Sequence, residues 1–98
     1  VPHLRGVDRF VTFTAEGGQG RYFDCPLVVD GAPVASRRRY VTEELTDHAL
    51  EFVSQPRRQP FCLYLSHKAA HHPWRPAPDL EGIYANERVE LPAQANSW

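Results

Sequence analysis

The sequence predicts an α/β fold that contains hairpin strands, one helix and one buried central strand. Two β-branched runs flank an Asp-Gly pair within residues 27–34, which is the pattern of a hairpin. Apolar residues then recur at helical spacing over residues 43–54. A nearly continuous apolar run at residues 60–65 is typical of a strand that is covered on both faces. The chain therefore combines extended and helical elements.

The extended elements begin at residues 9–13, where polar and apolar side chains alternate and include β-branched and aromatic types. The hairpin strands are expected at residues 27–29 and 32–34, because an Asp-Gly pair favours a two-residue turn between them. Pro33 has no backbone N–H to donate to a ladder, so it confines the second hairpin strand to a sheet edge.

The helix is expected over residues 43–54, with Thr42 as its N-cap and two glutamates in its first turn, where the helix dipole favours them. Pro56 ends the helical pattern. His48 lies beside the apolar face, and a lone helical histidine is more often structural than catalytic.

The apolar run at residues 60–65 needs neighbouring strands and cover on both faces. The chain offers only one good helix and hairpin strands, so sequence around it is expected to supply the rest. The chain also lacks Met and stops after a polar, proline-containing segment. We therefore expect a piece of a larger protein, incomplete at both ends.

Composition excludes several functional classes. The net charge is -1 and no long run of like charges occurs, so nucleic acid is not an expected partner. No apolar stretch approaches the roughly 18 to 20 residues that span a bilayer, and no signal peptide is recognisable. The residues do not report a localisation. Cys25 and Cys62 are interpreted as reduced core thiols in preference to a disulfide.

Two segments invite an anion-binding interpretation that we do not favour. The Gly-rich loop at residues 17–20 lacks the Lys-Ser/Thr of a P-loop, and it precedes an extended segment, whereas a phosphate cradle opens a helix. The three arginines at residues 37–39 could contact a sulfate-like group, but such a run is more often a solvated surface.

The favoured site follows the apolar run, at residues 66–74, because open α/β sheets place their chemistry at the carboxyl ends of strands. Lys68 supplies a compact cation, and His67 and His71 supply donors that can release a proton near neutral pH. These groups suit a tetrahedral oxyanion, and the small alanines at residues 69–70 would let it approach the backbone.

A metal site and a plain surface loop remain alternatives for the same segment. His67, His71 and His72 form a cluster, and imidazole is a common zinc ligand. His67 and His71 would share a face only on a helix, which Pro73 and the preceding strand disfavour. The ammonium group of Lys68 would also repel a cation.

Residues 60–71, Pro-Phe-Cys-Leu-Tyr-Leu-Ser-His-Lys-Ala-Ala-His, closely resemble the sulfatase-family segment PFFLYLSHKAVH. Blocks at residues 6–10, 20–23 and 40–50 are similar to the stretch that precedes this motif in bacterial arylsulfatase-like enzymes. Pro76-Ala77-Pro78 and Tyr84 fit downstream, so the resemblance covers about residues 6–92.

This resemblance implies that residues 1–98 are a partial sulfatase catalytic domain of the alkaline-phosphatase-like α/β type. Such sulfuric ester hydrolases use a formylglycine, made from Cys or Ser, beside a calcium ion. The expected substrates are sulfated small molecules or sulfated carbohydrates. His71 resembles the family histidine that hydrogen-bonds the sulfate or leaving-group oxygen, and Lys68 and His67 are the other expected substrate contacts.

The departures from the family are equally informative. Cys25-Pro26-Leu27 does not have the Cys/Ser-x-Pro-Ser-Arg form of the nucleophile motif, and the family's metal-binding aspartates have no recognisable counterpart. The formylglycine and the calcium ligands are therefore expected outside this segment, which alone should be inactive. Family resemblance also implies an exported parent, periplasmic or extracellular. The alternatives are a phosphate-ester or phosphonate hydrolase of the same superfamily, or a non-catalytic anion-binding module.

Overall fold

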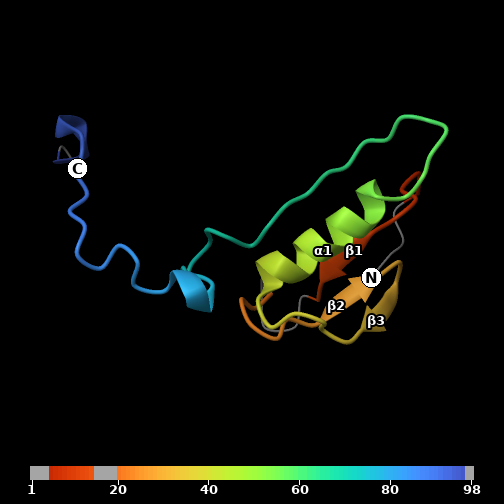
Figure 1. Ribbon diagram of the computed structural model, residues 1–98, viewed down its shortest axis with the longest axis horizontal. Coiled ribbons are helices and arrows are strands. Elements are labelled where there is room, and N and C mark those ends of the chain that lie inside the picture. Colours follow the sequence, from red (N-terminus) through yellow and green to blue (C-terminus); the bar gives the residue numbers. More distant parts are fainter. Residues whose placement is uncertain (1–4, 15–19, 97–98) are drawn as a thin grey trace.

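A computed structural model of the chain describes residues 5–14 and 20–96. A three-stranded antiparallel sheet has the order β1-β2-β3, and one helix, α1, lies against it (Figure 1). The elements are β1 (Val11–Phe13), β2 (Leu27–Val29), β3 (Ala32–Val34), α1 (Val41–Val53), and the 3-10 helices η1 (Pro78–Leu80) and η2 (Ala93–Asn96). The mixed α/β class predicted from the sequence is confirmed.

The hairpin forms as predicted, with Val29 opposite Ala32 across the turn. Asp30 and Gly31 both have positive φ, 49° and 88°, as a two-residue turn of this kind requires. The Asp30 carboxylate also accepts the backbone N–H of Phe10 at 2.7 Å, which ties the turn to the chain entering β1. Because β3 pairs only with β2 in the described residues, its proline lies on an edge strand, as expected.

The helix begins earlier than the sequence predicts. Its N-cap is Tyr40, in an extended conformation and without a side-chain cap, so the predicted N-cap Thr42 is wrong. Long-range backbone pairing explains the difference: Tyr40 forms a β-bridge with Phe23, and the N–H of Val41 donates to the carbonyl of Tyr22 at 2.8 Å. A partner distant in the sequence therefore satisfies a donor that a cap side chain would otherwise take.

The core is small, and it reaches from the sheet to a loop late in the chain. Its buried members come from the sheet, the start of α1, the segment before β2 and one alanine far downstream. They are Tyr22, Cys25, Leu27, Tyr40, Val41, Leu45 and Ala77. Ala77 brings the segment that follows the candidate site into contact with the folded part of the chain.

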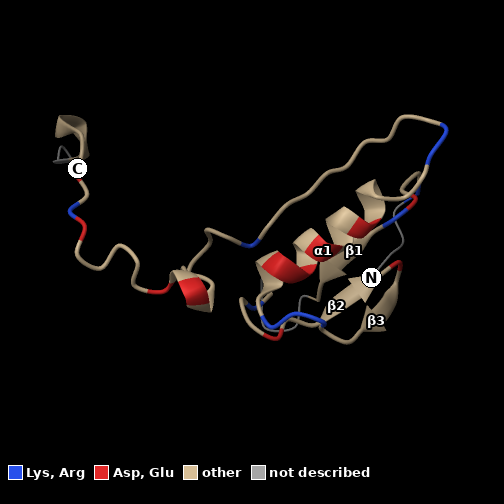
Figure 2. Ribbon diagram, in the orientation of Figure 1, with Lys and Arg blue, Asp and Glu red and all other residues tan. Residues whose placement is uncertain are grey.

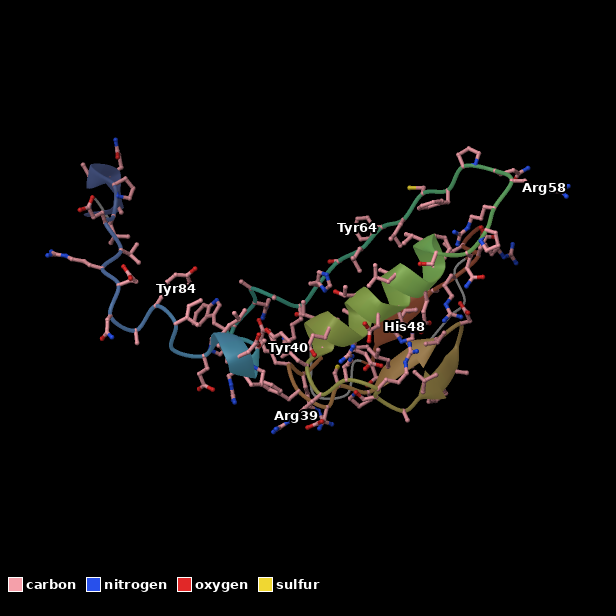
Figure 3. All side chains as sticks on the ribbon, viewed as in Figure 1. Arg39, Tyr40, His48, Arg58, Tyr64 and Tyr84 are labelled. Carbon is pink, nitrogen blue, oxygen red and sulfur yellow. The ribbon has the colours of Figure 1, made fainter. Side chains whose placement is uncertain are left out.

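The predicted buried central strand at residues 60–65 is wrong for this structure. The segment is extended, but it pairs with no strand in the described residues, and Tyr64 is 90% exposed (Figure 3). It lies beside α1, where the Phe61 ring meets Phe52 edge-on at 5.6 Å, and the guanidinium group of Arg57 lies 4.9 Å from the centre of the Phe61 ring. A helix has no free backbone groups along its side to build a ladder, so the segment stays a single extended chain.

The two cysteines are both free, but only one is a core thiol. Cys25 is buried, whereas Cys62 is exposed on the extended segment, so the expectation of two core thiols is wrong for Cys62. The Gly-rich loop at residues 17–20 lies outside the described residues except for Gly20.

Residues 78–96 lead away from the sheet and helix (Figure 1). The radius of gyration is 17.3 Å, whereas a compact domain of this length would have about 13 Å. In the part of the chain that the structure describes, no helix is long and apolar enough to cross a membrane.

Candidate anion-binding site

The segment predicted to bind an oxyanion turns back onto the core after the extended run. The Tyr22 hydroxyl donates to the carbonyl of His71 at 2.5 Å, and the Tyr40 hydroxyl donates to the carbonyl of Arg75 at 2.8 Å. Ala77, 8% exposed, then joins the core. These three contacts hold residues 67–77, which we call the site loop, beside the N-terminal end of α1 (Figure 1).

Two turns shape the site loop from within. The N–H of His71 donates to the carbonyl of Lys68 at 2.8 Å, and the N–H of Trp74 donates to the carbonyl of His71 at 3.0 Å. Trp74 has a positive φ of 50°. The peptide bonds Ala69–Ala70 and His72–Pro73 are cis. The carbonyl of His71 therefore accepts two hydrogen bonds, one from the core and one from the site loop itself.

Lys68 is mostly buried, with 9% of its surface exposed. Its ammonium nitrogen lies 5.2 Å from the centre of the Tyr22 ring, within the range of a cation–π contact. The sequence predicted the charge of this residue but not its aromatic neighbour. The contact with the ring restricts the positions that the ammonium group can take. A cation that binds a substrate needs such a defined position.

His71 is exposed, and one of its ring nitrogens is already engaged. Nδ1 lies 2.7 Å from the carbonyl oxygen of His72, and a carbonyl only accepts, so Nδ1 carries a proton. Nε2 is then an acceptor in the neutral ring and a donor in the imidazolium. His71 can therefore donate a hydrogen bond to an oxyanion from Nε2 when it is protonated.

His67, the third predicted contact, is partly buried. Its Nδ1 is buried and has no hydrogen-bond partner within the described residues. An unpaired buried nitrogen costs on the order of 1 to 3 kcal/mol, so this position favours a partner that the described chain does not supply.

The metal alternative is not supported here. His67, His71 and His72 are all described, and no group of three or more His, Cys, Asp or Glu in residues 5–14 and 20–96 could hold a metal ion.

The arginines at residues 37–39 point to a structural role. Arg37 pairs with Glu51 at 2.5 Å and Arg38 with Asp47 at 2.8 Å, and both carboxylates belong to α1. Figure 2 shows the basic segment before α1 and the acidic positions along the helix. These hydrogen bonds lower the pKa of Glu51 and of Asp47. Arg39 lies 3.8 Å from Asp24.

The same arginine segment encloses a buried carboxylate. Glu44 is 1% exposed, and its Oε2 accepts the backbone N–H groups of Arg37, at 2.8 Å, and of Arg38. Its other oxygen lies 3.8 Å from Nε2 of His48 (Figure 3). Burial, followed by the charge of Arg37, lowers the pKa of His48. Both residues fix the chain before α1, which agrees with a structural role for His48.

Sequence reasoning missed Tyr22 and Tyr40 as core residues that anchor the site loop. Tyr22 lies 49 positions from the carbonyl that it contacts, and Tyr40 lies 35 positions from its own. No local pattern reports contacts of that span. Their only sequence signal is that both fall in the blocks that resemble the sulfatase family.

Comparison with known proteins gives one informative match. No family model matches the chain, and no solved structure matches it. Over 81 residues the chain is 36% identical to the "Uncharacterized sulfatase YdeN" of Escherichia coli (strain K12), an alignment that includes 80% of this chain. The chain spans 14% of the length of that relative. The chain is therefore similar in sequence to a segment of a protein named a sulfatase.

Proposed function

We propose that the intact protein containing this chain hydrolyses sulfate esters, and that the site loop forms one wall of its sulfate-binding site. The observation that carries the proposal is the 36% identity to a protein named a sulfatase. That alignment includes 80% of this chain. The placement of Lys68 and His71 in one anchored loop supports the same proposal.

The chemistry assigns different roles to the site residues. When a sulfate monoester is cleaved, negative charge gathers on the bridging oxygen, and a nearby donor stabilises that charge. His71 in its imidazolium form would donate from Nε2 to the leaving-group oxygen. Lys68 would contact the sulfate oxygens as a fixed positive charge. His67 is the third substrate contact.

The remaining parts of the site would come from outside this segment. A formylglycine would supply the nucleophile, and a calcium ion would neutralise charge on the sulfate. The chain would then be part of a larger sulfatase domain of the alkaline-phosphatase-like type, incomplete at both ends. Exposed apolar side chains on the extended run, including Phe61, Leu63 and Leu65, support this part of the proposal. Substrates would be sulfated small molecules or sulfated carbohydrates, and the parent would be exported.

The test is hydrolysis by the full-length protein, produced together with an enzyme that forms formylglycine. We expect turnover of 4-nitrophenyl sulfate in preference to 4-nitrophenyl phosphate. His71→Ala should lower kcat/KM by about 100- to 1,000-fold, the usual effect of losing a donor to developing charge. His72→Ala is the matched control, because its ring contacts Trp74 and its side chain has no assigned role; we expect less than about a threefold change.

Each contrary result has a distinct meaning. Preference for the phosphate ester would replace the proposal with a phosphoesterase of the same superfamily. If the protein hydrolyses neither ester but sulfate still binds at the site loop, the remaining interpretation is a non-catalytic anion-binding module.

A further inference from the structure

We propose that Tyr22 is a positioning residue that sets the places of His71 and Lys68 together. The inference rests on the proposed function and adds to it a residue that the sequence motif does not contain. Tyr22 does not contact the substrate in this proposal. It acts through the two residues that do.

Tyr22 contacts both candidate sulfate-binding residues with different parts of one side chain. Its hydroxyl donates to the backbone carbonyl of His71 at 2.5 Å. Its ring lies 5.2 Å from the ammonium nitrogen of Lys68. Because Tyr22 is 4% exposed, neither contact is weakened much by water. A movement of this ring would therefore displace both residues at once.

The side chain can serve as a reference point because its own backbone is held. The carbonyl of Tyr22 accepts the N–H of Val41 at 2.8 Å, at the start of α1. The next residue, Phe23, forms a β-bridge with Tyr40, and the rings of Tyr22 and Tyr40 stack with centroids 6.1 Å apart. Tyr22 thereby links the site loop to the start of α1, so the position of the loop depends on the position of the helix.

Contact at the backbone leaves the catalytic side chain free. The hydroxyl of Tyr22 binds the main-chain carbonyl of His71, so this anchor engages neither nitrogen of the imidazole ring. A donor must lie within about 0.5 Å of its productive place, and a shift of about 1 Å can lower a rate about 100-fold. Loss of one anchor at this carbonyl is therefore expected to change the chemistry more than the stability.

Tyr40 provides a matched control within the same cluster. It is also buried, and its hydroxyl also donates to a site-loop carbonyl, that of Arg75 at 2.8 Å. Its ring stacks on that of Tyr22 and lies 5.3 Å from that of Phe23, and its hydroxyl contacts the main chain four residues after His71. Tyr22→Phe and Tyr40→Phe thus remove the same atom and the same kind of hydrogen bond from two different places.

The experiment measures how the rate depends on the leaving group in the full-length protein. A series of aryl sulfates, from acidic phenols such as 4-nitrophenol to phenol itself, separates reactions that need little proton donation from those that need much. For Tyr22→Phe we expect kcat to fall about 10- to 100-fold on phenyl sulfate and less than about threefold on 4-nitrophenyl sulfate. Tyr40→Phe should lower both rates equally and by less than about threefold.

Three results would count against the inference. An equal loss on all substrates for Tyr22→Phe, tracking its thermal unfolding midpoint, would make Tyr22 a structural residue only. If His71→Ala steepens the dependence on the leaving group and Tyr22→Phe does not, positioning by Tyr22 is refuted while the proposed function stands. If the wild-type protein hydrolyses no sulfate ester, the proposed function fails, and the positioning role fails with it.

Discussion

Two neighbouring segments of this chain differ in how they contact the rest of the fold. Residues 60–65 are extended and exposed, whereas the site loop, residues 67–77, is tied to the core by two tyrosine hydroxyls and a buried alanine. The site loop needs only a few donors for its carbonyls, and the chain supplies them. The extended run needs a neighbouring backbone for its whole length, and the described residues supply none. The comparison distinguishes a segment whose hydrogen-bond partners lie within the described chain from a segment whose backbone partners do not.

Hydrogen exchange should give the largest difference between the isolated chain and the intact protein. None of the amides of residues 61–65 has a hydrogen-bond partner in the described part of the chain, so they should exchange there almost as in an unfolded peptide. If the run becomes a central strand in the intact protein, its exchange should slow by at least about a thousandfold. Equally fast exchange in both would rule out that strand.

Truncation of matched leucines sharpens the same comparison. Leu27 on β2 is 1% exposed, whereas Leu65 on the extended run is 45% exposed. In the isolated chain, Leu27→Ala should lower the free energy of unfolding by about 2 to 5 kcal/mol, and Leu65→Ala by less than about 0.5 kcal/mol. Urea unfolding followed by circular dichroism measures both. Similar losses for the two variants would contradict the observed difference in burial.

The buried carboxylate before α1 should have a smaller effect. Glu44→Ala leaves the backbone N–H groups of Arg37 and Arg38 without their acceptor, and should cost about 1 to 3 kcal/mol. Glu43, its exposed neighbour in the same helical turn, is the control, and Glu43→Ala should cost less than about 0.5 kcal/mol. The thermal unfolding midpoints of the two variants provide the measurement. Equal shifts would mean that Glu44 is not the acceptor that orders this segment.

The smallest expected effect is the dependence of stability on pH through His48. Its pKa in the folded chain is below the ordinary 6.5, because burial and the charge of Arg37 disfavour the imidazolium. The unfolded chain therefore binds this proton more readily, so the stability is complete above about pH 6.5 and falls as the pH decreases below it. The lowered carboxyl pKa values of Asp47 and Glu51 act only at more acidic pH. His48→Gln should flatten the slope of unfolding free energy between about pH 5 and 6.5; an unchanged slope would assign it to other groups.

The parts of the fold that the sequence predicted correctly depend on local interactions. The Asp-Gly turn, the edge position of Pro33 and the end of the helix before Pro56 follow from the backbone preferences of those residues. The N-cap was wrong because Val41 finds its acceptor at Tyr22, a partner that no local rule identifies. The central strand was wrong for this structure because burial depends on neighbours, not on the strand's own apolar residues.

The candidate site was predictable to a similar extent. Position after an apolar run, together with the chemistry of Lys68 and His71, indicated residues 66–74 as the site, and the structure places both residues in one anchored loop. Their roles toward a sulfate remain predictions. The anchors of that loop, Tyr22 and Tyr40, were not predictable, since each contact joins residues at least 35 positions apart.

The choice of anchor has an evolutionary consequence. Both tyrosine hydroxyls bind main-chain oxygens, which are present whatever amino acid occupies the position. Mutations at Trp74 or Arg75 could therefore change the exposed side chains of the site loop while the loop keeps its place. Descendants of such a chain could change the surface of this loop in single steps, without first having to rebuild the scaffold that holds His71.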